Sequence, residues 1–158
     1  MIKVFISHQA ADGLLAADIA RRLKTRHEID SYLDLIDPNI QKGEDLALHI
    51  QTEMGKCTQL LAVVSEKTQQ SWWVPWEIGV ATEKDYPLAT YAEGATRPPE
   101  YLRKWPYLRS HADLDLYAKA SRAAQRSLIQ KRATLNEGVA RFRATRDFYS
   151  ILRKDLGQ

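Results

Sequence analysis

One short segment concentrates the residue types that could do chemistry in this chain. From Ser71 to Glu77 the sequence reads Ser-Trp-Trp-Val-Pro-Trp-Glu, which contains three of the four tryptophans. Ser71 is suited to cap a helix and Pro75 is tolerated only near a helix start, so the segment is predicted to open a helix. Trp73 and Glu77 are four residues apart and therefore share one side of that helix. Indole faces beside a carboxylate suit a flat heteroaromatic ligand that carries ribose hydroxyls.

The chemistry open to Glu77 is the stabilisation of positive charge on a sugar. When the bond between a ribose and a positively charged base breaks, the base leaves neutral and the ribose becomes oxocarbenium-like. One well-placed ionised carboxylate stabilises such a cation and needs little help from a general acid. Two simpler interpretations stay open at this point. An acid in a first helical turn complements the helix dipole, and tryptophans such as Trp72 pack in cores.

Alternating strand and helix patterns must position this segment. Short apolar runs predict strands over 3–7, 29–35, 59–65 and 86–91, with a short edge strand over 107–109, and apolar residues at helical spacing predict helices between and after them. Asp12 is predicted to cap the first helix. The order implies an α/β, flavodoxin-like, three-layer fold with a parallel sheet of about five strands in the order 2-1-3-4-5. The expected division is a domain over 1–115 and a helical extension over 116–158.

In this topology a ligand binds beyond the carboxyl ends of the strands, where the winding of the sheet reverses. Ser7 and His8 end the first strand and therefore border the expected crevice, as does the segment after Ser65. For His8 a turn residue satisfied by local hydrogen bonds is the alternative interpretation.

Composition limits the class of protein. The chain has 158 residues, 44% of them hydrophobic and 27% charged, and a net charge of +3, which is typical of one soluble globular domain. Its longest apolar run, 60–64, is far too short to cross a membrane. The sequence starts with a predicted strand, so no signal peptide is expected, and the lone Cys57 fits a reducing compartment. We therefore expect a cytoplasmic protein.

The last quarter of the chain is basic. This charge is either a solvated helical face or a docking surface for a negative partner, and it is carried by Arg122, Arg126, Lys131, Arg132, Arg141, Arg143, Arg146, Arg153 and Lys154. No nucleic-acid motif accompanies these residues, so nucleic acid is not an expected partner. The sequence also lacks a Cys/His cluster and a Gly-rich phosphate loop, so no metal and no bound cofactor are predicted.

Three motifs resemble those of TIR (Toll/interleukin-1 receptor) domains. The run from Lys3 to His8 followed by Asp12 is similar to their first box, and Asp37 to Gly43 resembles the loop after their second strand. The third motif, Ser71-x-Trp73-Val74-x-x-Glu77, matches Ser-x-Trp-Cys-x-x-Glu with valine in the cysteine position. The likeness covers about residues 2–110, and the single-domain layout resembles bacterial TIR proteins of Thoeris-type anti-phage defence.

The resemblance implies cleavage of the nicotinamide–ribose bond of NAD+, which would be a substrate and not a cofactor. It also implies self-association through TIR surfaces and a downstream effector that senses an ADP-ribose-derived product, either cyclic or conjugated. Glu77 takes the position of the catalytic glutamate. The positions that correspond to substrate contacts are Ser7, His8, Asp37, Trp73 and Trp76. For Asp37, which precedes a proline, a plain turn opener is the alternative.

Two other functions remain open. A non-catalytic TIR interaction module would act by homotypic assembly alone. A nucleoside deoxyribosyltransferase-like enzyme also joins a glutamate to a flavodoxin-like fold, and it would exchange bases on deoxynucleosides while ignoring NAD+.

Overall fold

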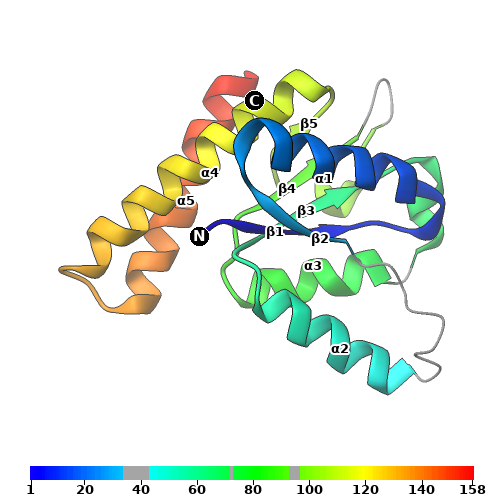
Figure 1. Ribbon diagram of the computed structural model, residues 1–158, viewed down its shortest axis with the longest axis horizontal. Helices are drawn as coiled ribbons and strands as arrows, with labels where there is room; N and C mark the ends of the chain where they lie inside the picture. Colours follow the sequence, from blue (N-terminus) through cyan, green and yellow to red (C-terminus); the bar gives the residue numbers. More distant parts are fainter. Residues whose placement is uncertain (34–42, 72, 93–96) are drawn as a thin grey trace.

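A parallel sheet forms the centre of the protein, as a computed structural model shows for residues 1–33, 43–71, 73–92 and 97–158 (Figure 1). The described strands lie in the order β2-β1-β3-β4-β5, and every neighbouring pair is parallel. Their bounds are β1 Lys3–Ser7, β2 Asp30–Leu33, β3 Gln59–Val63, β4 Leu88–Tyr91 and β5 Tyr107–Leu108. The predicted flavodoxin-like order and the short edge strand are therefore confirmed.

Helices cover both faces of the sheet. Their bounds are α1 Gly13–His27, α2 Gly43–Gly55, α3 Trp73–Glu83, α4 His111–Arg132 and α5 Glu137–Leu156, with short 3-10 helices η1 Ala10–Asp12, η2 Glu66–Gln70 and η3 Glu100–Leu102. Figure 1 shows α1 on one side of the strands and α2 and α3 on the other. Three layers result.

Successive side chains of each strand point to opposite faces of the sheet, so the hydrophobic core has two halves. Val4 and Ile6 of β1 point to the side of α1, α4 and α5, whereas Phe5 points to the side of α2 and α3. All five residues of β3 are buried, as expected for a strand covered on both faces. The site described below lies at the carboxyl ends of β1 and β3, where this double winding changes direction.

The C-terminal helices share a core with the sheet. Tyr117 of α4 and Phe148 of α5 are both fully buried and meet edge to face, with ring centroids 5.7 Å apart, in the same cluster as Val4. The helical extension thus packs on the α/β fold, and the hairpin of α4 and α5 continues past the sheet (Figure 1). The expected division at 115/116 falls within α4 and stays a prediction. Among the described residues, no helix combines the length and the apolar character of a membrane span.

One local prediction was wrong in its mechanism. Asp12 does occupy the N-cap position of α1, but its side chain makes no capping hydrogen bond. The carboxylate instead accepts a hydrogen bond of 2.9 Å from the Ser65 hydroxyl, across from the end of β3. The 3-10 turn of η1 enters the helix directly, so the Asp12 carboxylate is used for a tertiary contact.

Candidate functional site

Glu77 and Ser7 form the centre of the candidate site. Ser7 is the last residue of β1 and is fully buried, and its hydroxyl donates a short hydrogen bond to Oε2 of Glu77 on α3. Glu77 itself is 1% exposed. The bond joins residues 70 positions apart in the sequence. It therefore fixes a carboxylate at the carboxyl end of β1, beside the point where the strand order reverses.

Burial of Glu77 removes the helix-dipole interpretation. Helix α3 begins at Trp73, so Glu77 lies beyond the first turn, which contains no acidic residue. Pro75 is tolerated because it lies in that first turn, and the Ser71 hydroxyl accepts a 3.3 Å hydrogen bond from the Val74 amide, as predicted for a cap. A solvated carboxylate at a helix start would gain from the dipole at the surface, whereas this carboxylate is held inside the fold.

His8 follows Ser7 and is held by a local contact. Its ring is 8% exposed, and Nδ1 lies 3.0 Å from the carbonyl oxygen of Ile6. Because a carbonyl only accepts, Nδ1 carries the proton, which leaves Nε2 as the acceptor of the neutral ring. The local hydrogen bond agrees with the turn-residue interpretation. The predicted substrate contact of His8 would use Nε2 and stays a prediction.

A polar network joins the loops that follow β1 and β3. The Ser65 hydroxyl donates to Asp12, accepts a 3.4 Å hydrogen bond from the Gln9 amide, and accepts from the backbone of Lys67. The Ser65 backbone amide in turn donates to the Thr68 hydroxyl, at 2.8 Å. Asp12 is 8% exposed, so its carboxylate is buried within this network. The network fixes the relative position of two loops at the edge where Ser7 ends its strand.

Sequence reasoning did not foresee this network. Asp12 was expected to cap a helix, and only the segment after Ser65 was expected to border the crevice. The available signal was that both polar residues follow strands predicted to be neighbours in the sheet, whose carboxyl ends meet at one edge.

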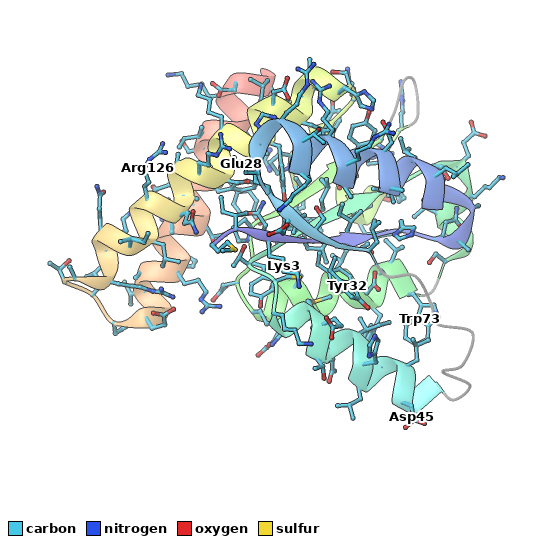
Figure 2. All side chains as sticks on the ribbon, in the orientation of Figure 1. Lys3, Glu28, Tyr32, Asp45, Trp73 and Arg126 are labelled. Carbon is cyan, nitrogen blue, oxygen red and sulfur yellow. The ribbon has the colours of Figure 1, made fainter. Side chains whose placement is uncertain are left out.

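Trp73 and Trp76 of α3 lie on the side of the sheet that α2 covers. Trp73 is half-buried against the second core cluster, on the same side of the sheet as Tyr32 (Figure 2). Its ring meets that of Trp76 edge to face, with centroids 5.7 Å apart. Trp76 also lines a shallow surface groove that includes Gln51 of α2 and Lys84. The packing interpretation therefore accounts for much of both indoles, and their predicted contact with substrate remains untested.

Two predicted features lie outside the described residues. These are Asp37, with most of the loop expected to border the crevice, and Trp72. The structure thus brings Ser7 and Glu77 into contact, places His8 next to them in the chain, and sets Trp73 four residues before Glu77 on the same helix. Among the described residues, no group of three or more His, Cys, Asp or Glu side chains is arranged to hold a metal ion.

The arrangement can hold one carboxylate in a fixed orientation in a water-poor environment. A charge in such a place acts on a cation more strongly than it would in water.

A comparison with protein families gives a match to the family described as TIR domain over residues 4–128. A search of curated proteins finds no match.

Proposed function

Because the chain belongs to the TIR domain family, of which both NAD+-cleaving enzymes and interaction modules are members, we propose that it cleaves the nicotinamide–ribose bond of NAD+. The observation that carries this proposal is the buried hydrogen bond between Ser7 and Glu77 at the carboxyl end of β1. A carboxylate held inside a fold costs free energy unless it is hydrogen-bonded, and Ser7 at the end of β1 supplies one such bond.

Glu77 acts in this proposal as an electrostatic partner of the ribose. Nicotinamide departs as a neutral base, so little general acid is needed at the leaving group. The positive charge that develops on the ribose is stabilised by the carboxylate, which Ser7 holds in position. Water, the adenine of the same molecule, or another nucleophile then captures the sugar, which gives ADP-ribose, a cyclic isomer or a conjugate.

Catalysis in this form requires an opening step. At 1% exposure the Glu77 carboxylate contacts a ribose only after neighbouring groups move. The aromatic neighbour Trp73, which is half-buried, and His8, which follows Ser7, are the described side chains proposed to border the opened site. Closure around NAD+ would then exclude water from the reacting carbon.

The same burial favours a second candidate, the interaction module. A scaffold that acts by homotypic assembly has no need of an accessible carboxylate, and a sealed Ser7–Glu77 bond then serves only to join β1 to α3. TIR domains commonly associate with one another, so assembly is compatible with either candidate.

The wider role is part of the proposal. An NAD+-cleaving chain of this kind would release an ADP-ribose-derived signal for a downstream effector, in a bacterial anti-phage system similar to Thoeris. Such a role predicts that expression together with a matching effector protects cells from phage, and that the Glu77→Gln variant gives no protection.

The decisive experiment measures nicotinamide release from NAD+ by the full chain over a range of protein concentrations. Glu77→Gln preserves the size and an acceptor oxygen but removes the charge, so it should abolish release while circular dichroism stays unchanged. Glu83→Gln makes the same chemical change on the exposed end of the same helix and should have no effect. Activity that survives in Glu77→Gln would remove this residue from the mechanism.

Two controls separate the alternatives. Self-association without nicotinamide release, at every concentration tested, would favour the interaction module. Base exchange on deoxynucleosides with no turnover of NAD+ would favour the deoxyribosyltransferase-like enzyme.

A further inference from the structure

A cavity of about 480 Å³ lies at the opposite edge of the sheet from Ser7 and Glu77. Its floor is formed by the loops that lead into β3 and β4, among them Thr58 and Pro87, and its roof by the hairpin of α4 and α5. Because Gln59 begins β3 whereas Ser7 ends the parallel strand β1, the cavity lies at the amino ends of the strands. It is therefore separate from the proposed NAD+ site. Its volume is within the range of small-molecule sites.

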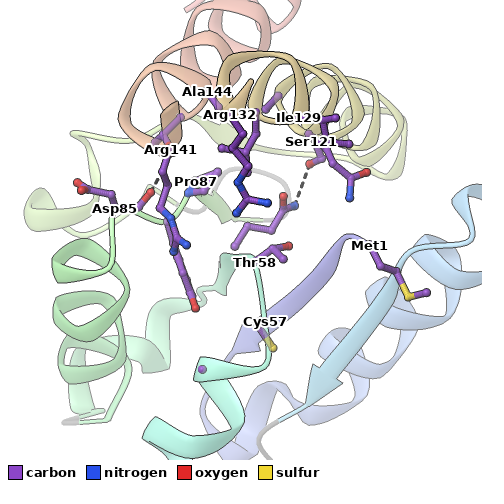
Figure 3. A pocket seen from close by; sticks show the side chains of 17 residues that line it. Met1, Cys57, Thr58, Asp85, Pro87, Ser121, Ile129, Arg132, Arg141 and Ala144 are labelled. Atoms are coloured by element: carbon purple, nitrogen blue, oxygen red, sulfur yellow. Dashed lines mark hydrogen bonds between the residues drawn. The ribbon is translucent and has the colours of Figure 1, made fainter. Parts of the chain in front are cut away.

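Two guanidinium groups reach into this cavity. Arg132 ends α4 and Arg141 lies in α5, and Figure 3 shows both side chains extending from the helices toward the loop that contains Thr58. Both bind the same oxygen, Oε1 of Glu137, and the contact from Arg141 is 3.1 Å. A single anionic oxygen thus already contacts both cations, so one anion can bind them together.

Glu137 is an exchangeable partner for these arginines. Its side chain is 52% exposed, and the two arginines are 46% and 38% exposed. Ion pairs at this exposure contribute little to stability, so replacing one anion by another costs little. Each guanidinium has five N–H donors, and a phosphate offers more oxygens to them than one carboxylate oxygen does.

The other residues that line the cavity are suited to a ligand that has both apolar and polar groups. Leu128, Ile129 and Ala124 of α4 and Ala144 of α5 supply apolar surface. Hydrogen-bonding side chains are present on the opposite wall and on α4, namely Thr58, Gln59, Ser121 and Gln125. Gln59 is held in place because its amide donates to Ser121, at 2.8 Å, and to Tyr117.

We propose that this cavity binds a small phosphate ester with an apolar or aromatic body. The phosphate replaces Glu137 on Arg132 and Arg141, and the body packs against the apolar surface of α4 and α5. A dianionic phosphate suits a pair of guanidiniums better than a single carboxylate does, because it can neutralise both. Asp85 also lines the cavity, and its negative charge weakens binding without blocking it.

Titration calorimetry of the full chain with AMP and with inorganic phosphate tests the proposal. AMP should bind, and it should bind at least about tenfold more tightly than inorganic phosphate, because only AMP has a body to bury. Arg132→Gln and Arg141→Gln should each weaken AMP binding by about tenfold or more, as expected for loss of a charge-assisted hydrogen bond. Glu137→Gln, which removes the competing carboxylate, should tighten binding.

Matched variants on the same helices make the test specific. Arg126 of α4 and Arg143 of α5 are exposed and do not line the cavity, so Arg126→Gln and Arg143→Gln remove the same charge elsewhere. They should change AMP affinity by less than about twofold, since exposed charges that make no direct contact with the ligand are largely screened by water and salt. Glu77→Gln should leave AMP affinity unchanged, so this test is independent of nicotinamide release.

Three results would overturn the proposal. One is the absence of AMP binding at millimolar concentration. Another is equal weakening by the control and the lining variants, which would indicate diffuse attraction to a basic surface. The last is equal affinity for AMP and inorganic phosphate, which would show that the apolar surface takes no part. Unfolding temperatures of all variants show whether each one is folded.

Discussion

The hydrogen bond between Ser7 and Glu77 gives a sharp prediction for stability. Ser7→Ala removes the hydroxyl that donates to the Glu77 carboxylate, at a position that is fully buried. The carboxylate stays in place at 1% exposure but loses the hydrogen bond from Ser7. Water has little access to compensate, so the cost includes the desolvation that the hydrogen bond had offset.

The expected cost follows from the burial and the charge. A buried hydrogen bond to a charged group contributes about 1.5–3 kcal/mol to the free energy of unfolding. For a chain of this size each kcal/mol shifts the unfolding temperature by about 2–4 °C, so Ser7→Ala should lower it by about 3–12 °C. The same loss should reduce nicotinamide release, because Glu77 is then less firmly oriented.

Ser31→Ala is the matched control. Ser31 lies on β2, directly beside Val4 of β1, and its hydroxyl is buried with no hydrogen-bond partner among the described residues. Its removal should change the free energy of unfolding by less than about 0.5 kcal/mol or increase it, because no bond is lost. Urea denaturation followed by tryptophan fluorescence measures both variants. Equal values for Ser7→Ala and Ser31→Ala would refute the reasoning.

Three further predictions follow from other contacts. Burial raises the pKa of Asp115, but hydrogen bonds from His27 and Arg22 outweigh this effect, so the pKa in the folded state is lowered. The ionised Asp115 therefore stabilises the fold at a pH above its unfolded-state pKa, and this stabilisation is lost as the pH falls through its folded-state pKa. Asp115→Asn should therefore cost up to about 1 kcal/mol at pH 7, reduced by solvent screening. The difference from wild type in urea titrations should begin to shrink below about pH 4 and vanish only below the lowered pKa of the folded state. Burial raises the pKa of the Cys57 thiol to about 11, so the reactive thiolate is scarce at pH 8. Alkylation of Cys57 at pH 8 should be at least about tenfold slower in the folded chain than in urea, and equal rates would contradict this. A chain ending at residue 128 loses the fully buried Phe148 and should not fold cooperatively; a sharp thermal transition by near-ultraviolet circular dichroism would show that α5 is dispensable.

Local patterns in the sequence were sufficient for the layout of the fold. The continuous apolar run from 60 to 64 indicated a strand covered on both faces, and all five residues of β3 are buried. Strands that alternate with helices imply parallel pairing, because each helix carries the chain back across the sheet in a right-handed crossover. The observed strand order confirms this prediction. Such features depend on the period of hydrophobic residues, which is a property of the chain itself.

The candidate site was predictable in its residue types but not in its burial. The spacing of Ser71, Trp73 and Glu77 identified the helix, and the end of the first strand identified Ser7. From position alone, however, a first-turn surface carboxylate was equally reasonable for Glu77. The structure excludes a first-turn position, because α3 begins at Trp73 and the Ser7 hydroxyl donates a hydrogen bond to the Glu77 carboxylate inside the fold.

The exact pairing of polar side chains from distant segments was not determined by the local sequence patterns. The basic C-terminal quarter was open to two interpretations, and only the folded hairpin shows Arg132 and Arg141 sharing Glu137 above a cavity. Asp12 was suited to cap a helix by residue type, yet it binds Ser65, 53 positions away. Periodicity and residue type act within a few turns of chain and so determined the elements. The partner of a polar side chain depends on which elements the core brings together, and this was decided by the tertiary structure alone.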